Sequence, residues 1–114
     1  MSDGKRLHNR QLRGIVHMAD SGIHGKGLFA SRRIARGEYI GTFHGPQARR
    51  DGTYVLWVYD EGSGDEPIGR SGRNLLRYLN HSARCNAEFT GFDLYARRII
   101  RCGDEITIDY GHVE

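Results

Sequence analysis

The sequence predicts a mainly β domain built from several small sheets, and three observations support this fold class. The chain has 114 residues, the size of a single domain. Short runs of β-branched and aromatic residues recur at irregular intervals of roughly ten to fifteen residues. Glycine supplies 16 residues, about twice its usual share, so tight turns separate the runs. One small domain leaves no room for separate cofactor and substrate lobes.

Six runs are predicted to be strands, because their residues favour extended backbone. They are residues 15–18, 27–30, 39–43, 54–59, 92–96 and 105–108. Residues 74–79, with the sequence NLLRYL, predict only a short helical turn. Residues 60–67 (DEGSGDEP) form an acidic loop, whose simplest interpretation is a solvated hairpin tip. A patch that attracts a basic peptide is the alternative.

The chain shows no segment for membrane crossing or secretion. No stretch approaches the ~18 apolar residues of a membrane span. The first residues, MSDGKR, lack the apolar centre of a signal peptide. We therefore expect an intracellular protein without membrane contact, cytoplasmic if its source is bacterial, with the nucleus as an option if the source is eukaryotic or viral.

The cysteines and histidines do not follow the spacing of a metal site. Cys85 and Cys102 can form at most one disulfide, and no Cys-x-x-Cys pair is present. The six histidines form no His-x-x-x-His pair. We therefore predict two reduced, buried thiols and no bound metal.

The net charge of +3 is concentrated at the N-terminus. Residues 1–14 contain four basic residues and one acidic residue, whereas residues 15–114 carry equal numbers of each. This pattern divides the chain into a basic tail over residues 1–14 and a folded domain over residues 15–114. A solvated tail is the simplest interpretation, and a weak contact with nucleic acid or an acidic partner is the alternative.

Two arginine-rich segments resemble each other. Residues 32–38 (RRIARGE) and 97–105 (RRIIRCGDE) lie 65 residues apart, and both lead into a predicted strand. Two copies do not make a repeat array. They predict two similar turns that expose charged residues and bury an isoleucine.

Three polar segments are candidates for a functional site. Residues 21–29 (SGIHGKGLF) carry glycines that let a ligand approach the backbone closely, although a plain turn is the simplest interpretation. Residues 77–86 (RYLNHSARCN) concentrate hydrogen-bonding side chains, or form a polar turn. Residues 103–111 (GDEITIDYG) place a tyrosine after a strand, or form a terminal edge strand.

Together these segments resemble the SET-domain protein-lysine methyltransferases, in particular the small free-standing type of bacteria and viruses. The resemblance covers residues 15 to 111 and rests on four motifs in the family's order. They are Gly-x-Gly-Leu-Phe at 25–29, Gly-Glu at 37–38, Arg-Tyr-Leu-Asn-His-Ser at 77–82 and Glu-Ile-Thr-Ile-Asp-Tyr-Gly at 105–111. The resemblance implies a β-clip-like SET fold with a C-terminal pseudoknot, in which the last segment lies beside the Asn-His strand.

The resemblance also implies a site for S-adenosyl-L-methionine and a channel for a substrate lysine. The implied catalytic residue is Tyr110. The implied cofactor-binding residues are His24, Gly25, Lys26, Gly27, Tyr54, Arg77, Asn80 and His81, and the implied lysine channel is lined by Phe43, Tyr54, Ile108 and Tyr110. The implied reaction, which needs no metal, is methyl transfer to a lysine ε-amine of a histone, a histone-like protein or another lysine-containing protein or peptide.

The sequence departs from the family pattern at several positions. Ala83 and Cys85 stand where the family's Asn-His-Ser-Cys-x-Pro-Asn has cysteine and proline. Phe43 replaces a frequent tyrosine, and Ile108 stands where some members have an aromatic residue. After Gly111 there is no cysteine-rich module or aromatic tail, the part that closes the lysine channel in many members.

These departures shape the expected partners and the alternative functions. We expect a homodimer whose second subunit closes the channel, with the N-terminal tail or the substrate as other options. One alternative function is a catalytically weak or silent cofactor-binding or interaction module. The other is a nucleic-acid binder that acts through residues 1–14.

Overall fold

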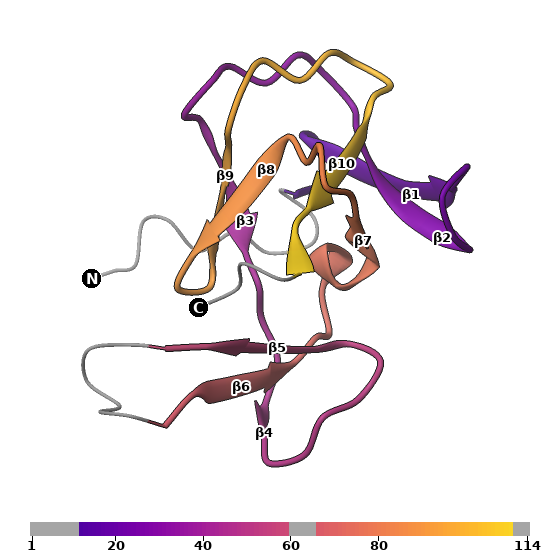
Figure 1. Ribbon diagram of the computed structural model, residues 1–114. Coiled ribbons are helices and arrows are strands. Elements are labelled where there is room, and N and C mark those ends of the chain that lie inside the picture. The colour runs from indigo at the N-terminus through magenta and orange to yellow at the C-terminus, as the bar shows by residue number, and fades with distance from the viewer. Residues whose placement is uncertain (1–11, 60–65, 111–114) are drawn as a thin grey trace.

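Ten strands and one 3-10 helix make up the described part of the computed structural model, residues 12–59 and 66–110. The strands are β1 (Val16–Asp20), β2 (Lys26–Ala30), β3 (Tyr39–Thr42), β4 (Gln47–Ala48), β5 (Val55–Val58), β6 (Ile68–Ser71), β7 (Asn80–His81), β8 (Ala87–Thr90), β9 (Asp93–Ala96) and β10 (Glu105–Ile108), and the helix is η2 (Leu75–Tyr78). They form one four-stranded sheet, β1-β2-β10-β7, and two three-stranded sheets, β3-β9-β8 and β4-β6-β5 (Figure 1). The predicted mainly β fold of several small sheets is confirmed.

Each of the six predicted runs contains a strand, with ends shifted by no more than two residues. The predicted helical turn is η2. Four strands have no counterpart among the predicted runs: β4, β6, β7 and β8. They are short or polar, and cross-strand partners hold them extended, since strand propensity depends strongly on such context. Strands β5 and β6 are antiparallel neighbours, as a hairpin requires, while residues 60–65 of the predicted tip lie outside the described residues.

Strand β10 joins parts of the chain that are far apart in sequence. It pairs antiparallel with β2, where Ile106 faces Leu28, and parallel with β7, where Thr107 faces Asn80. Asn86 fixes this arrangement, because its side chain donates to the Glu105 carbonyl at 2.9 Å and accepts from the Thr107 amide at 2.9 Å. The last described strand therefore lies beside the Asn-His strand, as expected.

The core fills the space between the sheets and η2. Its fully buried side chains include Leu28, Ile40, Leu94 and Ile106. Leu12, which the sequence analysis placed in the basic tail, is also fully buried. A Cβ on Gly41 would lie 2.5 Å from the Leu12 Cδ2 atom, so β3 and Leu12 are in close contact. The packed part of the domain thus includes residue 12.

The two arginine-rich turns lie against each other, with an isoleucine of each turn buried. The buried pair is Ile34 and Ile100, which form an antiparallel bridge. The prediction of a buried isoleucine in each turn is confirmed, and in the second turn it is Ile100, since Ile99 is 50% exposed. Turn geometry rather than sequence similarity sets this register.

Both cysteines are free, and their environments differ. Cys85 is buried, but Cys102 is exposed, so the prediction of two buried thiols is wrong for Cys102. Cys102 lies in the turn that leads into β10, where its sulfur is 3.4 Å from the Ser31 carbonyl. Within the described ranges, no three His, Cys, Asp or Glu side chains are grouped as a metal site requires.

The described residues include no apolar helix of membrane-spanning length.

Candidate functional site

A cavity of about 660 Å³ lies where the loop before β2 meets η2 and β7. This volume falls within the roughly 300–1,000 Å³ of ordinary ligand sites. The cavity is lined by Ile23, His24, Gly25, Lys26, Thr53, Tyr54, Arg77, Tyr78, Leu79, Asn80, His81 and Tyr110. The structure therefore brings together every cofactor-binding residue expected from the sequence except Gly27, and adds Tyr110. We call it the cofactor-side cavity.

Asn80 holds the loop that forms one wall of this cavity. Its side-chain amide donates to the carbonyl oxygens of His24 at 3.0 Å and Lys26 at 3.1 Å. The same amide lies 2.9 Å from a carboxylate oxygen of Glu105. Glu105 in turn accepts from the Ser21 hydroxyl at 2.8 Å. The Glu105 carboxylate on β10 thus connects Ser21, at the start of the loop, to Asn80, which holds the end of the loop.

Gly27 supports the site without lining the cavity. A Cβ at this position would lie 2.3 Å from a carboxylate oxygen of Glu105, so only glycine lets β2 pass this close. Glu105 and Ser21 support the site but are not among the residues predicted for it. Ser21 is the first residue of segment 21–29, and Glu105 is the first residue of motif 105–111. The signal that could have identified them is this position, a polar residue at the start of a glycine-rich segment or a strand.

Arg77 and two tyrosines form a second wall. The Arg77 guanidinium donates to the carbonyls of Arg73 and Asn74, each at 3.0 Å, and to the Tyr78 hydroxyl at 2.7 Å. Its carbon atom lies 4.4 Å from the centre of the Tyr78 ring. The rings of Tyr54 and Tyr78 meet edge to face, with centres 6.1 Å apart. The wall is aromatic and cationic, and these contacts preorganise it.

Tyr110 is held at both its backbone and its hydroxyl group. Its amide donates to Nδ1 of His81 at 2.9 Å, and its hydroxyl donates to the Leu79 carbonyl at 2.7 Å. Nδ1 of His81 is an acceptor here, so the ring proton belongs on Nε2. Partial burial raises the pKa of the Tyr110 phenol above its ordinary value of 10.0. The hydroxyl is therefore a neutral, fixed group.

A second cavity of about 460 Å³ shares Thr53 and Tyr110 with the first, and we call it the β5-side cavity. It is lined by Asp51, Gly52, Thr53, Val55, Leu56, Trp57, Ile108 and Tyr110. Two of the four expected channel residues, Ile108 and Tyr110, are brought together here. Tyr54 lines the cofactor-side cavity instead. Phe43 lines neither of these two cavities: it is buried, and its ring packs edge-on against Phe89.

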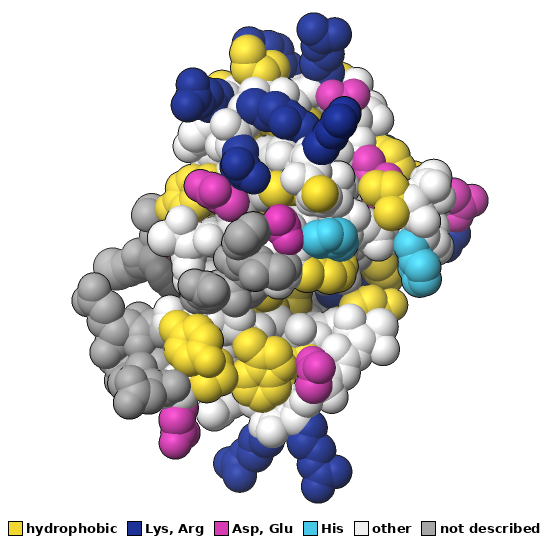
Figure 2. Space-filling view, viewed as in Figure 1, with side chains coloured by type: hydrophobic (Ala, Val, Ile, Leu, Met, Phe, Trp, Pro, Cys, Tyr) yellow, Lys and Arg dark blue, Asp and Glu magenta, His cyan; other side chains and the backbone are white. Residues whose placement is uncertain are grey.

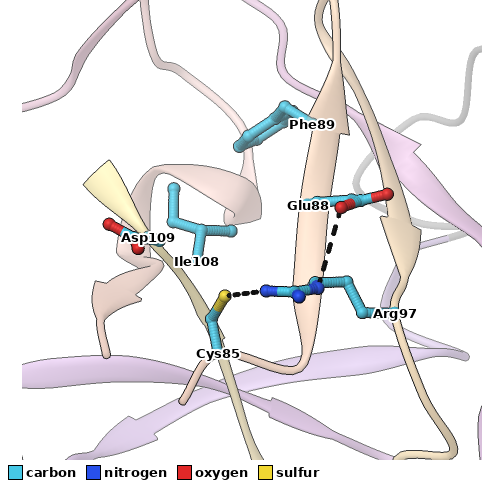
Figure 3. Close-up of a pocket in the computed structure, with 7 residues that line it drawn as sticks. Cys85, Glu88, Phe89, Arg97, Ile108 and Asp109 are labelled. Atoms are coloured by element: carbon cyan, nitrogen blue, oxygen red, sulfur yellow. Dashed lines mark hydrogen bonds and ion pairs between the residues drawn. The ribbon is translucent and has the colours of Figure 1, made fainter. Parts of the chain in front are cut away.

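A third cavity of about 220 Å³ lies behind Ile108, between β8, β9 and the end of β10 (Figure 3). Arg97 donates to the sulfur of Cys85 at 3.0 Å and lies 3.7 Å from a carboxylate oxygen of Glu88. The hydrogen bond to Cys85 is the main cause of a raised Arg97 pKa. Ile108 separates this small cavity from the β5-side cavity, since it lines both.

Strand β5 presents a hydrogen-bonding edge next to the β5-side cavity. It is the outer strand of the sheet β4-β6-β5. The Gly72 amide donates to the Tyr54 carbonyl at 2.7 Å, which makes residues 54, 56 and 58 the ones bonded toward β6. The backbone polar groups of Val55 and Trp57 therefore point away from β6. Figure 2 shows hydrophobic side chains gathered over this strand, with an acidic side chain beside them.

Comparisons with known proteins agree with this geometry. The family model described as SET domain matches residues 25–111. The methyltransferase domain of human PR domain-containing protein 2 superimposes with a TM-score of 0.68 at 19% identity, covering 88% of this chain and 79% of that chain. A Plasmodium falciparum protein proposed to be a histone methyltransferase superimposes with a TM-score of 0.66 at 22% identity, covering 86% of this chain and 94% of that chain.

The two kinds of comparison carry different weight. At these identities, the superpositions show a shared fold. The family match spans most of the chain and includes β2, the Asn-His strand and Tyr110. Together the findings support methyltransferase activity. On this combined ground, the chain belongs to the SET-domain family.

Proposed function

We propose that this protein is an S-adenosyl-L-methionine-dependent protein-lysine N-methyltransferase. The observation that carries the proposal is the position of Tyr110, which lines both the cofactor-side cavity and the β5-side cavity. A methyl donor in the first cavity and an amine in the second would meet at this one side chain. Two substrates that enter from opposite sides are what a direct methyl transfer requires.

The residues of the cofactor-side cavity suit a zwitterionic, sulfonium-bearing nucleoside. Arg77 supplies positive charge for a carboxylate, while the ammonium of Lys26, which also lines the cavity, pairs with Asp20. Tyr54, Tyr78 and Tyr110 supply ring faces, which attract cations such as a sulfonium. S-adenosyl-L-methionine, when bound, supplies a methyl group already activated by the positive sulfur.

The protein's contribution to the reaction is alignment and proton control. Because the Tyr110 hydroxyl donates its proton to the Leu79 carbonyl, its oxygen lone pairs remain available toward the boundary of the two cavities. They can accept weak C–H···O contacts from a methyl group in transfer. A lysine amine, whose ordinary pKa is about 10.4, must be neutral to attack. Ile108 and Leu56 line an apolar path that favours the neutral amine by excluding water.

The edge of β5 suits an extended substrate peptide. A peptide strand added to this edge would hydrogen-bond with the outward backbone groups of Val55 and Trp57 and direct alternate side chains toward Tyr110. Asp51 lies at the same cavity and would favour a cationic peptide. Lysine-rich proteins, histones and histone-like proteins among them, are the substrate class this arrangement favours.

The central test is transfer of labelled methyl groups from S-adenosyl-L-methionine to histones and to proteins of a cell lysate. We expect incorporation on lysine, and a loss of about 100-fold in Tyr110→Phe, because one lost anchor misaligns the reacting atoms. Tyr59→Phe is the matched control, since Tyr59 is equally exposed but lines neither cavity beside Tyr110. Calorimetric binding of the cofactor with no transfer to any protein would favour the silent-module alternative instead.

A second test addresses the peptide strand. Peptides with N-methylated backbone amides at alternate positions lose hydrogen bonds in one register only. We call the two alternating sets of methylated amides the two phases. We expect one of the two phases to raise the KM for the peptide by about tenfold or more, since each lost hydrogen bond contributes roughly 0.5–1.5 kcal/mol. Equal KM values for both phases would contradict docking along β5.

A further inference from the structure

One end of the folded domain is strongly basic. It consists of residues 31–38 and 97–104, the two loops at the top of Figure 1. Ile34 and Ile100 join the loops by exchanging two backbone hydrogen bonds of 2.8 and 2.9 Å. Figure 2 shows Lys and Arg side chains gathered over this end. We call this surface the arginine end.

The two loops repeat the same turn. The Ala35 amide donates to a carboxylate oxygen of Glu38 at 2.9 Å, and the Arg101 amide donates to one of Asp104 at 3.1 Å. In each turn the acidic residue's own amide bonds back to the same partner's carbonyl, at 3.0 Å in both cases. The carboxylates of the two turns are therefore engaged in holding backbone.

Arginines far outnumber these carboxylates on the arginine end. The exposed arginines are Arg32, Arg33, Arg36, Arg97, Arg98 and Arg101. Arg32 pairs with Glu38 at 2.6 Å, and Arg97 lies 3.7 Å from Glu88. Arg98 donates to a backbone carbonyl rather than to a carboxylate. Much of the positive charge is thus left uncompensated.

Three of these side chains carry the strongest signal. Arg33, Arg36 and Arg101 make no side-chain hydrogen bond or ion pair with any residue of ranges 12–59 and 66–110. Their turns are fixed by the Ile34–Ile100 bridge, so the guanidinium groups project from a rigid base. Fixed cations that form no hydrogen bond or ion pair within the described residues raise the local potential and attract polyanions, and Arg33 acts on Glu38 only through a weaker charge effect.

The chemistry of the arginine end favours a phosphate backbone. Guanidinium groups bind phosphates through two parallel hydrogen bonds. The basic residues of the arginine end are all arginines, because the chain has lysine only at positions 5 and 26. Residues 31–38 and 97–104 contain no aromatic residue on which an unpaired base could stack. Ile99 is the one large apolar side chain exposed there in the described residues, which is little for the core of a protein interface. Double-stranded DNA needs only spaced cations.

We propose that the arginine end binds the phosphate backbone of double-stranded DNA without sequence preference. This surface is made of residues 31–38 and 97–104 and does not draw on residues 1–14. Arg97 also lines the small cavity behind Ile108, so DNA bound there would lie beside the proposed substrate path. The proposal does not depend on methyl transfer.

The test is fluorescence anisotropy with a labelled DNA duplex of about 30 base pairs, measured over a series of salt concentrations. The full chain is compared with the triple variant Arg33→Gln/Arg36→Gln/Arg101→Gln. We expect affinity to fall at least tenfold near 50 mM salt. We also expect the slope of log K against log salt to decrease by about 2–3, since each phosphate contact contributes about 0.9.

Two further variants test whether the loss of DNA binding is specific to the arginine end. Arg49→Gln/Arg50→Gln/Arg73→Gln removes the same charge from exposed sites outside the two turns, and its slope should stay near that of the unaltered chain. Arg33→Lys/Arg36→Lys/Arg101→Lys keeps the charge, so it should retain most of the slope. Equal losses in the two glutamine variants, or displacement of DNA by poly-glutamate at equal charge concentration, would overturn the proposal. So would an unaltered chain that binds no duplex at low salt.

Discussion

Glu105 joins the loop before β2 to the Asn-His strand through the Ser21 hydroxyl and the Asn80 amide. Its side chain does not line the cofactor-side cavity, so it is a positioning residue. In Glu105→Gln, one of the two acceptor oxygens becomes an NH₂ group and the negative charge is lost, so the link between Ser21 and Asn80 loses a charge-assisted hydrogen bond that contributes about 1.5–3 kcal/mol. We expect cofactor Kd to rise by about tenfold or more in calorimetry.

The control for this prediction is Glu88→Gln, which alters an exposed glutamate on β8. A positioning role predicts a raised KM for the cofactor with little change in KM for the peptide. If both KM values changed together with the melting temperature, Glu105 would be a general stabilising residue instead.

Tyr110 provides a prediction on pH. Partial burial raises the pKa of its phenol, so the folded chain retains a proton that the unfolded chain releases above pH 10.0. This contribution to stability is complete below that pH and is lost as pH rises through the folded-state pKa. The difference in ultraviolet absorbance titrations between the unaltered chain and Tyr110→Phe should give a midpoint above 10.0. A midpoint at or below that value contradicts the burial argument.

For single residues, the sequence predicted which side chains belong to the site better than it predicted what those side chains contact. His24, Asn80, His81 and Tyr110 were all expected near one ligand, and they line one cavity. The contacts of Glu105 could not be predicted, because they depend on β10 lying beside both β2 and β7. No local pattern encodes that juxtaposition.

Among the elements, the segment before β1 contributes to the core through Leu12, although its sequence is basic. Leu12 is fully buried, although it stands between basic residues. Leu12→Ala should lower the free energy of unfolding by about 2–5 kcal/mol, because truncation of a packed leucine leaves a cavity. Denaturant unfolding measures this value, with Arg13→Ala as an exposed neighbouring control. A change below about 0.5 kcal/mol would contradict tight packing at this position.

The strands differ in how well the sequence indicates them. Val55–Val58 and Asp93–Ala96 are rich in β-branched, aromatic or other apolar residues, and both were predicted. Asn80–His81 and Ile68–Ser71 carry polar residues or glycine and were not. Asn80–His81 is extended because β10 hydrogen-bonds to it. On β6, a Cβ added to Gly69 would lie 2.6 Å from a ring atom of Trp57, so the Trp57 ring covers this glycine. Tertiary pairing decides such segments.

For the whole molecule, charge counts along the chain did not reveal the charge distribution in space. Residues 15–114 carry balanced charge, yet the packing of residues 31–38 against 97–104 gathers arginines at one end. Only the folded chain shows which carboxylates are engaged in turns.

The open site also predicts an assembly. Tyr54, Tyr59 and Tyr110 are 44%, 54% and 55% exposed around the two main cavities and β5, and exposed aromatic surface of this kind favours a partner. We propose a homodimer in which a second copy covers this side. Analytical ultracentrifugation should give about twice the chain mass of 12.9 kDa, and Tyr59→Glu should shift it toward the monomer. A mass of one chain at all working concentrations contradicts the dimer.

The place of β10 has a consequence for biosynthesis. A ribosome delivers the N-terminal residues first, yet the strand between β2 and β7 comes from residues 105–108. A nascent chain that has not yet exposed Glu105 beyond the exit tunnel has the residues of β2 and of the Asn-His strand, but lacks the strand that pairs with both. The cofactor-side cavity is therefore complete only after nearly all of residues 1–110 have emerged, because Tyr110 also lines it.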